Sequence, residues 1–276
     1  MTIFAGQGDA ARSMALLWGG QDAPGSPAGG PRKPPGPKRA LSLDMIVESA
    51  IAVADADPMT GVSLRAVADS LGCTSMALYT YVPGKGELLD LMYDRAHAEL
   101  ATRHDLSQGW RAAVTSWAGE LRSFYLRHPW VLQVSYARPV LGPHEQAVME
   151  TLAGILFQTG LPAAALRAIV AALFHFVRGN AQAAAESRLA ATATGMSDEE
   201  WWAGRSTVLM RLAPDFAERF PMSVRLSAED RTPARGGGAT HVEDQADETF
   251  ATGLAVLLEG VDATRNTLLP PPSASA

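Results

Sequence analysis

Cysteine is nearly absent from this chain, since only Cys73 occurs among 276 residues. One cysteine excludes an internal disulfide and a multi-cysteine metal site, and it suits the reducing cytoplasm, where we place the protein. Cys73 lies in a predicted turn, where a small packed residue is the favoured interpretation and a redox sensor the alternative.

Long uninterrupted apolar runs are also missing. The longest apolar stretch, 161–177, is interrupted by Arg167 and His175 and followed by Arg178, which does not suit the roughly 20 residues of a membrane span. We interpret it as a buried or dimer-forming helix. No basic region leads into an apolar stretch at the N-terminus, so we expect no secretory signal. Whether translation starts at Met1 or Met14 stays open.

Catalytic motifs are missing as well. The chain has no Gly-x-Ser-x-Gly elbow and no His-Glu-x-x-His pair, and Gly84-Lys85-Gly86 lacks the spacing and hydroxyl of a phosphate loop. The six histidines show no paired helical metal spacing, and His175 fits a core position better than a ligand. We expect no catalytic residue, no metal and no cofactor, with an all-helical enzyme as the minor alternative.

The net charge of -6 argues against general binding to nucleic acid, so a DNA contact requires a local basic patch. A Pro/Gly-rich segment, 1–40, is predicted to be disordered, and it carries one such cluster: Arg32, Lys33, Lys38 and Arg39. This arm could follow phosphates or enter a minor groove, but a solvated linker explains it equally well.

The most informative stretch is 41–97, which reads as short helices around a compact turn. Apolar Leu64, Val67, Ala68 and Leu71 recur at helical spacing. They are followed by Gly72, which suits a left-handed helix end, and then by a good N-cap, Thr74. This order predicts a helix-turn-helix, although a plain two-helix hairpin shows similar spacing.

The second helix of this motif is short and needs few buried residues. We expect Met76, Leu78 and Val82 to face the core, which leaves polar and small neighbours for a major groove. Arg65 and Lys85 are the best candidates for phosphate contacts. The full set of predicted DNA-binding residues is Ser63, Arg65, Thr74, Ser75, Met76, Ala77, Tyr79, Thr80, Tyr81 and Lys85. Acidic residues, namely Asp44, Glu48, Asp55 and Asp57, are expected to face away from DNA.

The residues themselves resemble a known family. The run from Ser63 to Gly72, the segment Leu78-Tyr79-x-Tyr81-Val82 and the segment Lys85-x-Glu87-Leu88-Leu89 closely resemble the N-terminal domain of tetracycline-repressor-like (TetR-family) regulators. The resemblance implies an all-α fold with an N-terminal helix-turn-helix domain and a larger ligand-binding and dimerisation domain. We expect these domains at 41–100 and 101–265, with a disordered tail at 266–276.

Longer apolar helices are predicted after His97. One has an apolar face from Trp110 to Tyr125 and ends before Pro129, another runs from Pro143 to Gly160, and a third begins near Pro162. Ser197-Asp198-Glu199-Glu200 predicts a capping box. A polar, glycine-rich loop is expected at 223–241, followed by a last helix that carries Phe250, Leu254, Leu257, Leu258 and Val261.

The resemblance implies that the helix near Pro162 and the last helix pair with their copies in a homodimer. Two-fold symmetry would place two recognition helices about one DNA turn apart, roughly 34–36 Å. A monomer that buries those faces internally is the alternative.

An effector cavity is expected between the C-terminal helices, because ligand sites in helical bundles lie there. The candidate residues are Trp117, Leu121, Tyr136, Arg138, Pro139 and Phe174. Core packing explains Trp117, Leu121 and Phe174 as well. The Arg138-Pro139 pair resembles the pocket segment of tetracycline-binding members of the family, but Val134 and Ala101 stand where those members have histidines. Metal-chelated tetracycline is therefore a poor candidate effector.

These expectations combine into a ligand-responsive DNA-binding regulator. The resemblance favours a repressor that a small molecule releases from a palindromic double-stranded operator, while an activator or a scaffold of the same fold stays open. We expect the fourth helix of the N-terminal domain, Glu87 to about Leu100, to swing when ligand binds.

Overall fold

The computed structural model describes residues 3–19, 41–57, 63–229 and 240–269. Within these ranges the chain is helical almost throughout and forms no strand, apart from an isolated parallel bridge between Ile3 and Val134. The predicted all-α architecture is confirmed. The basic cluster Arg32, Lys33, Lys38 and Arg39 lies outside the described residues.

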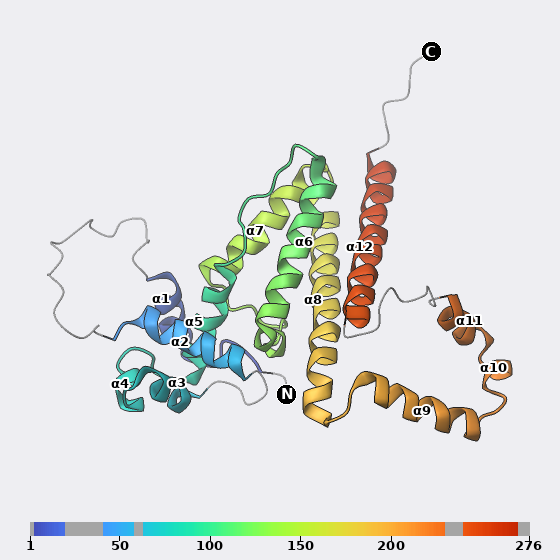
Figure 1. Ribbon diagram of the computed structural model, residues 1–276. Helices are drawn as coiled ribbons and strands as arrows, with labels where there is room; N and C mark the ends of the chain where they lie inside the picture. Colours follow the sequence, from blue (N-terminus) through green and yellow to red (C-terminus); the bar gives the residue numbers. More distant parts are fainter. Residues whose placement is uncertain (1–2, 20–40, 58–62, 230–239, 270–276) are drawn as a thin grey trace, which may run out of the picture.

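The N-terminal domain contains α2 (Leu43–Ala56), α3 (Leu64–Leu71), α4 (Ser75–Tyr79) and α5 (Lys85–His97), and it lies at one end of the molecule (Figure 1). The first three of these helices begin with Ser42, Ser63 and Thr74, whose side-chain oxygens each accept a backbone N–H three residues ahead. The buried face of α2, from Ile46 to Ala54, packs against α3 and α5. Local caps therefore set where each helix starts, and apolar burial sets how the helices pack.

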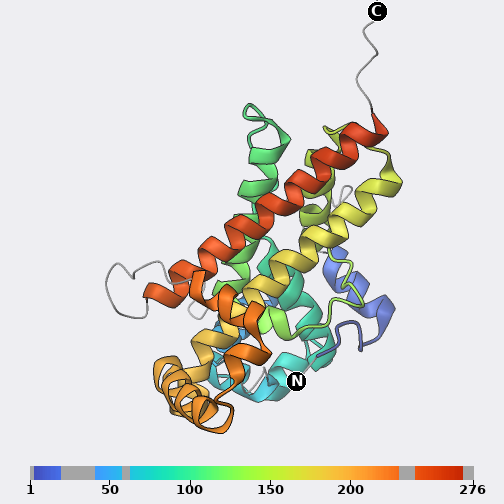
Figure 2. The same ribbon diagram turned by 90° about the vertical axis from the view of Figure 1, so that its right-hand side faces the viewer.

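The C-terminal domain is built on α6 (Gly109–Arg127), α7 (Pro143–Phe157), α8 (Ala163–Thr194) and α12 (Thr240–Leu268). A short 3-10 helix, η1 (Pro129–Gln133), follows α6. Helix α8 lies between α6 and α12 and runs beside α12 (Figures 1 and 2). The helices predicted from Trp110, Pro143 and Pro162 are confirmed. Helix α12 extends three residues past the expected limit of 265, and residues 270–276 lie outside the described ranges.

A helical arm leaves the bundle after α8. It comprises α9 (Asp198–Leu212), α10 (Phe216–Arg219) and α11 (Pro221–Glu229), and it extends away from the other helices in Figure 1. The predicted capping box at Ser197 and Glu200 is present. The bounds predicted for the loop, 223–241, are wrong at both ends, because α11 continues to Glu229 and α12 already begins at Thr240.

The N-terminal segment 3–19 also departs from the prediction. Residues 1–40 were expected to be disordered, but Ala10–Trp18 form helix α1, which Asp9 caps and which packs against α5. The prolines on which that expectation rested begin at Pro24, beyond this segment, and residues 20–40 are not described. No described helix is long and apolar enough to cross a membrane.

Candidate DNA-reading helices and effector cavity

A glycine shapes the turn between α3 and α4. Gly72 has φ +64°, a left-handed conformation that other residues adopt at a cost, and the Cys73 N–H donates to the Ala68 carbonyl at 3.0 Å. The Thr74 hydroxyl then accepts the Ala77 N–H at 3.3 Å. Helix α4 thus begins four residues after α3 ends, which is the compact turn that the sequence predicted.

Helix α4 buries one side chain and exposes most of the others. Leu78 and, just beyond the helix, Val82 are completely buried, as predicted, but Met76 is 77% exposed. The prediction that Met76 faces the core is wrong, because five helical residues offer room for one contact with the core. Tyr79 and Tyr81 are also exposed, so α4 presents a ridge of large side chains to solvent.

The ten predicted DNA-binding residues all lie on this motif. Ser75 and Ala77 are half-buried, and the exposed members are Ser63, Arg65, Thr74, Met76, Tyr79, Thr80, Tyr81 and Lys85. The cations Arg65 and Lys85 lie in the first turns of α3 and α5. Two acids of α2 are partly neutralised, because Arg95 lies 3.6 Å from the Asp44 carboxylate and 3.2 Å from that of Glu48.

A cavity of about 230 Å³ lies between α5 of the N-terminal domain, helices α6, α7 and α8 of the C-terminal domain, and the loop that joins η1 to α7. Aromatic side chains form much of its wall. Its lining residues are Tyr93, His97, Tyr125, Tyr136, Pro139, Glu145, Gln146, Val148, Met149 and Phe174.

Three of the six predicted effector residues line this cavity, namely Tyr136, Pro139 and Phe174. Trp117 and Leu121 are buried in the core, where the Trp117 ring meets the Phe174 ring edge-on at 5.0 Å, so packing explains both. Arg138 is exposed in the turn between Tyr136 and Pro139 and does not reach the lining.

Sequence reasoning missed the α5 and α7 walls of the cavity. Tyr93 and His97 are four residues apart on α5 and therefore share a face, and their rings lie 4.5 Å from each other. Glu145 and Met149 show the same spacing on α7. The spacing was visible in the sequence, but α5 was assigned wholly to the DNA-binding domain.

Burial shifts the pKa values of three titratable groups in the cavity wall toward their uncharged forms. Burial lowers the pKa of His97 to about 4 and raises that of Tyr125 to about 12. Burial also raises the pKa of Glu145, although hydrogen bonds from the loop backbone oppose that rise. Nδ1 of His97 lies 2.7 Å from the Tyr93 carbonyl, so a neutral ring donates there and leaves Nε2 as an acceptor.

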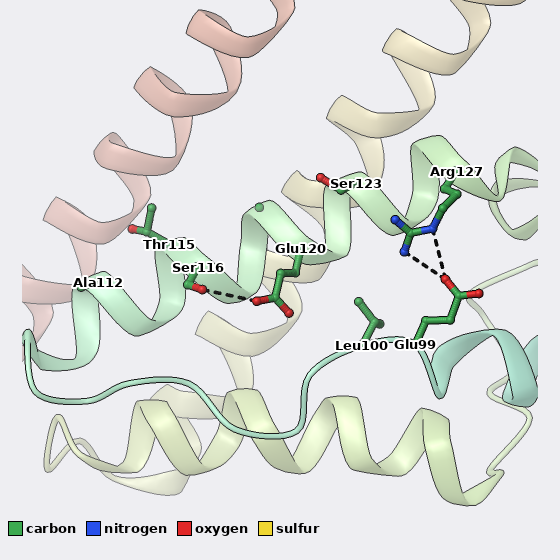
Figure 3. A pocket seen from close by; sticks show the side chains of 9 residues that line it. Glu99, Leu100, Ala112, Thr115, Ser116, Glu120, Ser123 and Arg127 are labelled. Atoms are coloured by element: carbon green, nitrogen blue, oxygen red, sulfur yellow. Dashed lines mark hydrogen bonds and ion pairs between the residues drawn. The ribbon is translucent and has the colours of Figure 1, made fainter.

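A larger hollow of about 810 Å³ lies on the outer face of α6 (Figure 3). It is shallow and open to solvent, and its polar groups already pair with one another: Arg127 lies 3.0 Å from Glu99, and the Ser116 hydroxyl donates to Glu120 at 3.5 Å. The enclosed aromatic cavity is therefore the better ligand site. Within the described ranges, no three His, Cys, Asp or Glu side chains form a metal-binding group.

Comparison with known proteins agrees with this geometry. Residues 105–265 match the family model described as tetracyclin repressor-like, C-terminal domain. The chain is 39% identical to the HTH-type transcriptional repressor DrrR1 of Streptomyces coeruleorubidus over 233 residues, which cover 84% of this chain and 82% of that protein. It is 31% identical to an HTH-type transcriptional regulator of Saccharopolyspora erythraea, over 59% of this chain and 69% of the relative.

The chain belongs to the TetR family of transcriptional regulators. A solved structure of this family, Streptomyces coelicolor ActR in complex with actinorhodin, superposes with a TM-score of 0.64 at 25% identity, covering 82% of this chain and 99% of ActR. The present protein is thus a DNA-binding, ligand-responsive regulator.

In this TetR-family regulator, α5 belongs to both sites. Its first residue, Lys85, lies beside the DNA-reading motif, and its last turns place Tyr93 and His97 in the cavity wall. A second link joins the domains, because the His128 ring lies 2.8 Å from Asp55 at the end of α2 and 3.2 Å from Glu99 after α5. Helix α5 is therefore shared by the cavity wall and the helix-turn-helix domain.

Proposed function

We propose that this regulator is a repressor that binds a palindromic operator through α3 and α4 and releases it when a flat aromatic effector fills the cavity. The observation that carries the proposal is the position of α5, which begins at Lys85 next to the helix-turn-helix and places Tyr93 and His97 in the cavity wall. DrrR1 is named a transcriptional repressor, and ActR was solved with actinorhodin bound, which supports both the direction of control and the class of effector.

The chemistry of the cavity favours an uncharged aromatic ligand. Tyr136 and Phe174 stack at 5.8 Å, and both Tyr93 and Tyr125 lie deep in the wall, so flat rings gain face and edge contacts. Neutral His97 offers an acceptor to a ligand hydroxyl, and Glu145 provides a second polar contact. A phenol or hydroxyquinone fused to further rings satisfies this combination.

The size of the cavity indicates that it widens on binding. About 230 Å³ is below the roughly 300–1,000 Å³ of typical ligand sites, so a multi-ring effector must displace part of the wall. Tyr136 and Pro139 lie on a loop, so this is the part of the wall that a ligand displaces. The other wall residues lie at the start of α7 or on packed helices. Operator affinity falls by the free energy with which the ligand prefers the widened state. This coupling free energy is typically about 1–3 kcal/mol.

The operator is palindromic in this proposal because the regulator acts as a homodimer. We assign the dimer contact to α8 and α12, with the arm α9–α11 covering part of the second copy. The arm supports this assignment, since none of its described side chains is buried and its exposed apolar residues include Trp202, Leu212 and Leu226.

Selection of bound sequences from random duplex DNA tests the proposal. A two-fold symmetric consensus is expected for the wild type, and the Tyr79→Ala variant should enrich it much less. Enrichment without symmetry, or none above bulk DNA at moderate salt, would contradict the proposal.

Thermal unfolding with actinorhodin as the probe then tests the effector class. The probe should raise the Tm of the wild type more than that of Phe174→Ala or Tyr136→Ala. An equal rise in all three proteins would show that it binds outside the cavity.

A further inference from the structure

Residues 3–19 lie against two parts of the regulator that the proposed function requires to move. On one side the segment contacts α5, and on the other it contacts the loop 133–142, which carries Tyr136 and Pro139 of the cavity wall. Both contacts are made of specific hydrogen bonds.

The contact with α5 uses two buried carboxylates. Asp90 is 2% exposed and accepts the Gly6 N–H at 2.8 Å and the Ser13 hydroxyl at 3.0 Å. Glu87 is 7% exposed and accepts the Asp9 N–H at 3.1 Å. Every direct hydrogen bond described for these two carboxylates comes from the N-terminal segment, so three specific contacts fix the segment on α5.

Two facing glycines allow this approach. A Cβ on Gly8 would lie 2.3 Å from a carboxylate oxygen of Glu87, and a Cβ on Gly86 would lie 3.0 Å from the Gly8 backbone nitrogen. The backbone of the segment therefore rests directly on the first turn of α5. Even one added methyl group at position 8 must push the segment or Glu87 away.

The contact with the cavity loop is made at both ends of the loop. Ile3 donates to the Gln133 carbonyl at 2.8 Å and accepts the Ser135 N–H at 2.6 Å, just before Tyr136. At the other end, the Trp18 indole N–H donates to the Leu141 carbonyl at 3.0 Å. The segment thus spans the part of the wall that has to shift when a ligand enters.

Leu141 is the strained point of this arrangement. Its φ of +62° is the only positive value at a non-glycine residue among the described residues. Trp18 holds its carbonyl from outside, and the Glu145 carboxylate, a cavity wall group, accepts its N–H at 2.7 Å from inside. A ligand that draws Glu145 away removes one of the two restraints on this backbone.

We infer that residues 3–19 are a coupling element that ties the cavity loop to α5, so that displacement of the loop by an effector is transmitted to the DNA-reading helices. The inference rests on the proposed function for its ligand and its operator. The contacts of residues 3–19 can be tested without ligand or operator. A substitution that weakens the segment's contact with α5 or with the loop must also loosen the partner region.

The first experiment is hydrogen exchange of the full chain without DNA or ligand. Gly8→Ala and Trp18→Phe should each speed exchange at least tenfold in 133–142 and also in the first half of α5. The control is Gly154→Ala, whose added Cβ meets open space and which should leave the two regions unchanged. Faster exchange confined to residues 3–19 would overturn the inference.

The second experiment adds the operator duplex obtained by selection. Operator binding should change exchange in 133–142 of the wild type, and Gly8→Ala should abolish that change while operator binding itself persists. An unchanged 133–142 in the operator-bound wild type would overturn the coupling and leave the regulator intact. Failure to select any operator would instead refute the proposed function, and the first experiment would still decide whether the segment links loop and helix.

Discussion

The DNA-reading motif and the effector cavity are specified by the sequence in different ways. The reader is contained in a few consecutive turns, where Ser63, Gly72 and Thr74 set the helix ends within a span of twelve residues. The cavity draws its wall from α5 to α8, with Tyr93 and Phe174 far apart in the chain. Local caps and turns build the first site, whereas only the packing of the whole domain builds the second. Changes in the two sites should therefore have separable effects.

The largest effect is expected from the buried anchor of the reader. Leu78→Ala removes a completely buried side chain and should lower the free energy of unfolding by about 2–5 kcal/mol in urea unfolding, with loss of operator binding. Met76→Ala, at a 77% exposed position two residues earlier, is the matched control and should stay within about 0.5 kcal/mol. Equal effects of the two changes would contradict the described orientation of α4.

The cavity should show its own signature in the pH dependence of stability. Because burial lowers the pKa of His97 from 6.5 to about 4, the unfolded chain binds more protons between these values, and stability falls as the pH falls. From pH 7 to pH 5 this residue should cost about 2 kcal/mol, a loss that His97→Gln removes. If urea unfolding gives the variant the same pH dependence as the wild type, His97 is not buried in neutral form.

The exposed ridge of α4 should affect DNA binding without affecting stability. Tyr79→Ala is expected to weaken binding to the selected operator about tenfold, or about 1.4 kcal/mol, with an unchanged Tm. Tyr136→Ala in the cavity loop should leave operator affinity without ligand unchanged. Fluorescence anisotropy with labelled operator measures both, and a loss of affinity in Tyr136→Ala alone would reverse the assignment of the two sites.

The smallest effect is expected at the start of α5. Lys85→Ala should weaken operator binding a few-fold and reduce the slope of log affinity against log salt by about 0.9, as for the loss of one phosphate contact. Exposed Arg205 on the arm provides a control, since Arg205→Ala should leave the slope unchanged. An unaltered slope for Lys85→Ala would place this lysine away from the phosphates.

The parts of the fold that the sequence predicts are those with local signals. The cap at Thr74, the turn at Gly72 and the capping box at Ser197 were all readable because each depends on residues only a few positions apart. Helices α6, α7 and α8 were equally accessible through their apolar faces, and α7 and α8 also through the prolines at their starts. No local signal could place Met76, because a five-residue helix has no complete periodicity.

The cavity and the N-terminal segment depend on contacts between distant residues. Arg138 stood out by its motif, yet its turn directs it to solvent, while Tyr93 and His97 reach the cavity because α5 packs against α7. Helix α1 was missed because prolines beyond residue 23 dominated the interpretation of the whole segment. Its two anchors, Glu87 and Asp90, look like ordinary surface acids until the fold buries them.

The most direct test of paired DNA reading is a change of spacing within the selected operator. Inserting five base pairs between its half-sites rotates them by about half a helical turn, so a two-fold regulator can no longer place both α4 helices in the major groove. We expect at least a hundredfold loss of affinity for the operator expanded by five base pairs, and recovery of much of that affinity when ten base pairs are inserted. Equal affinity for the original and the five-base-pair operator would contradict it.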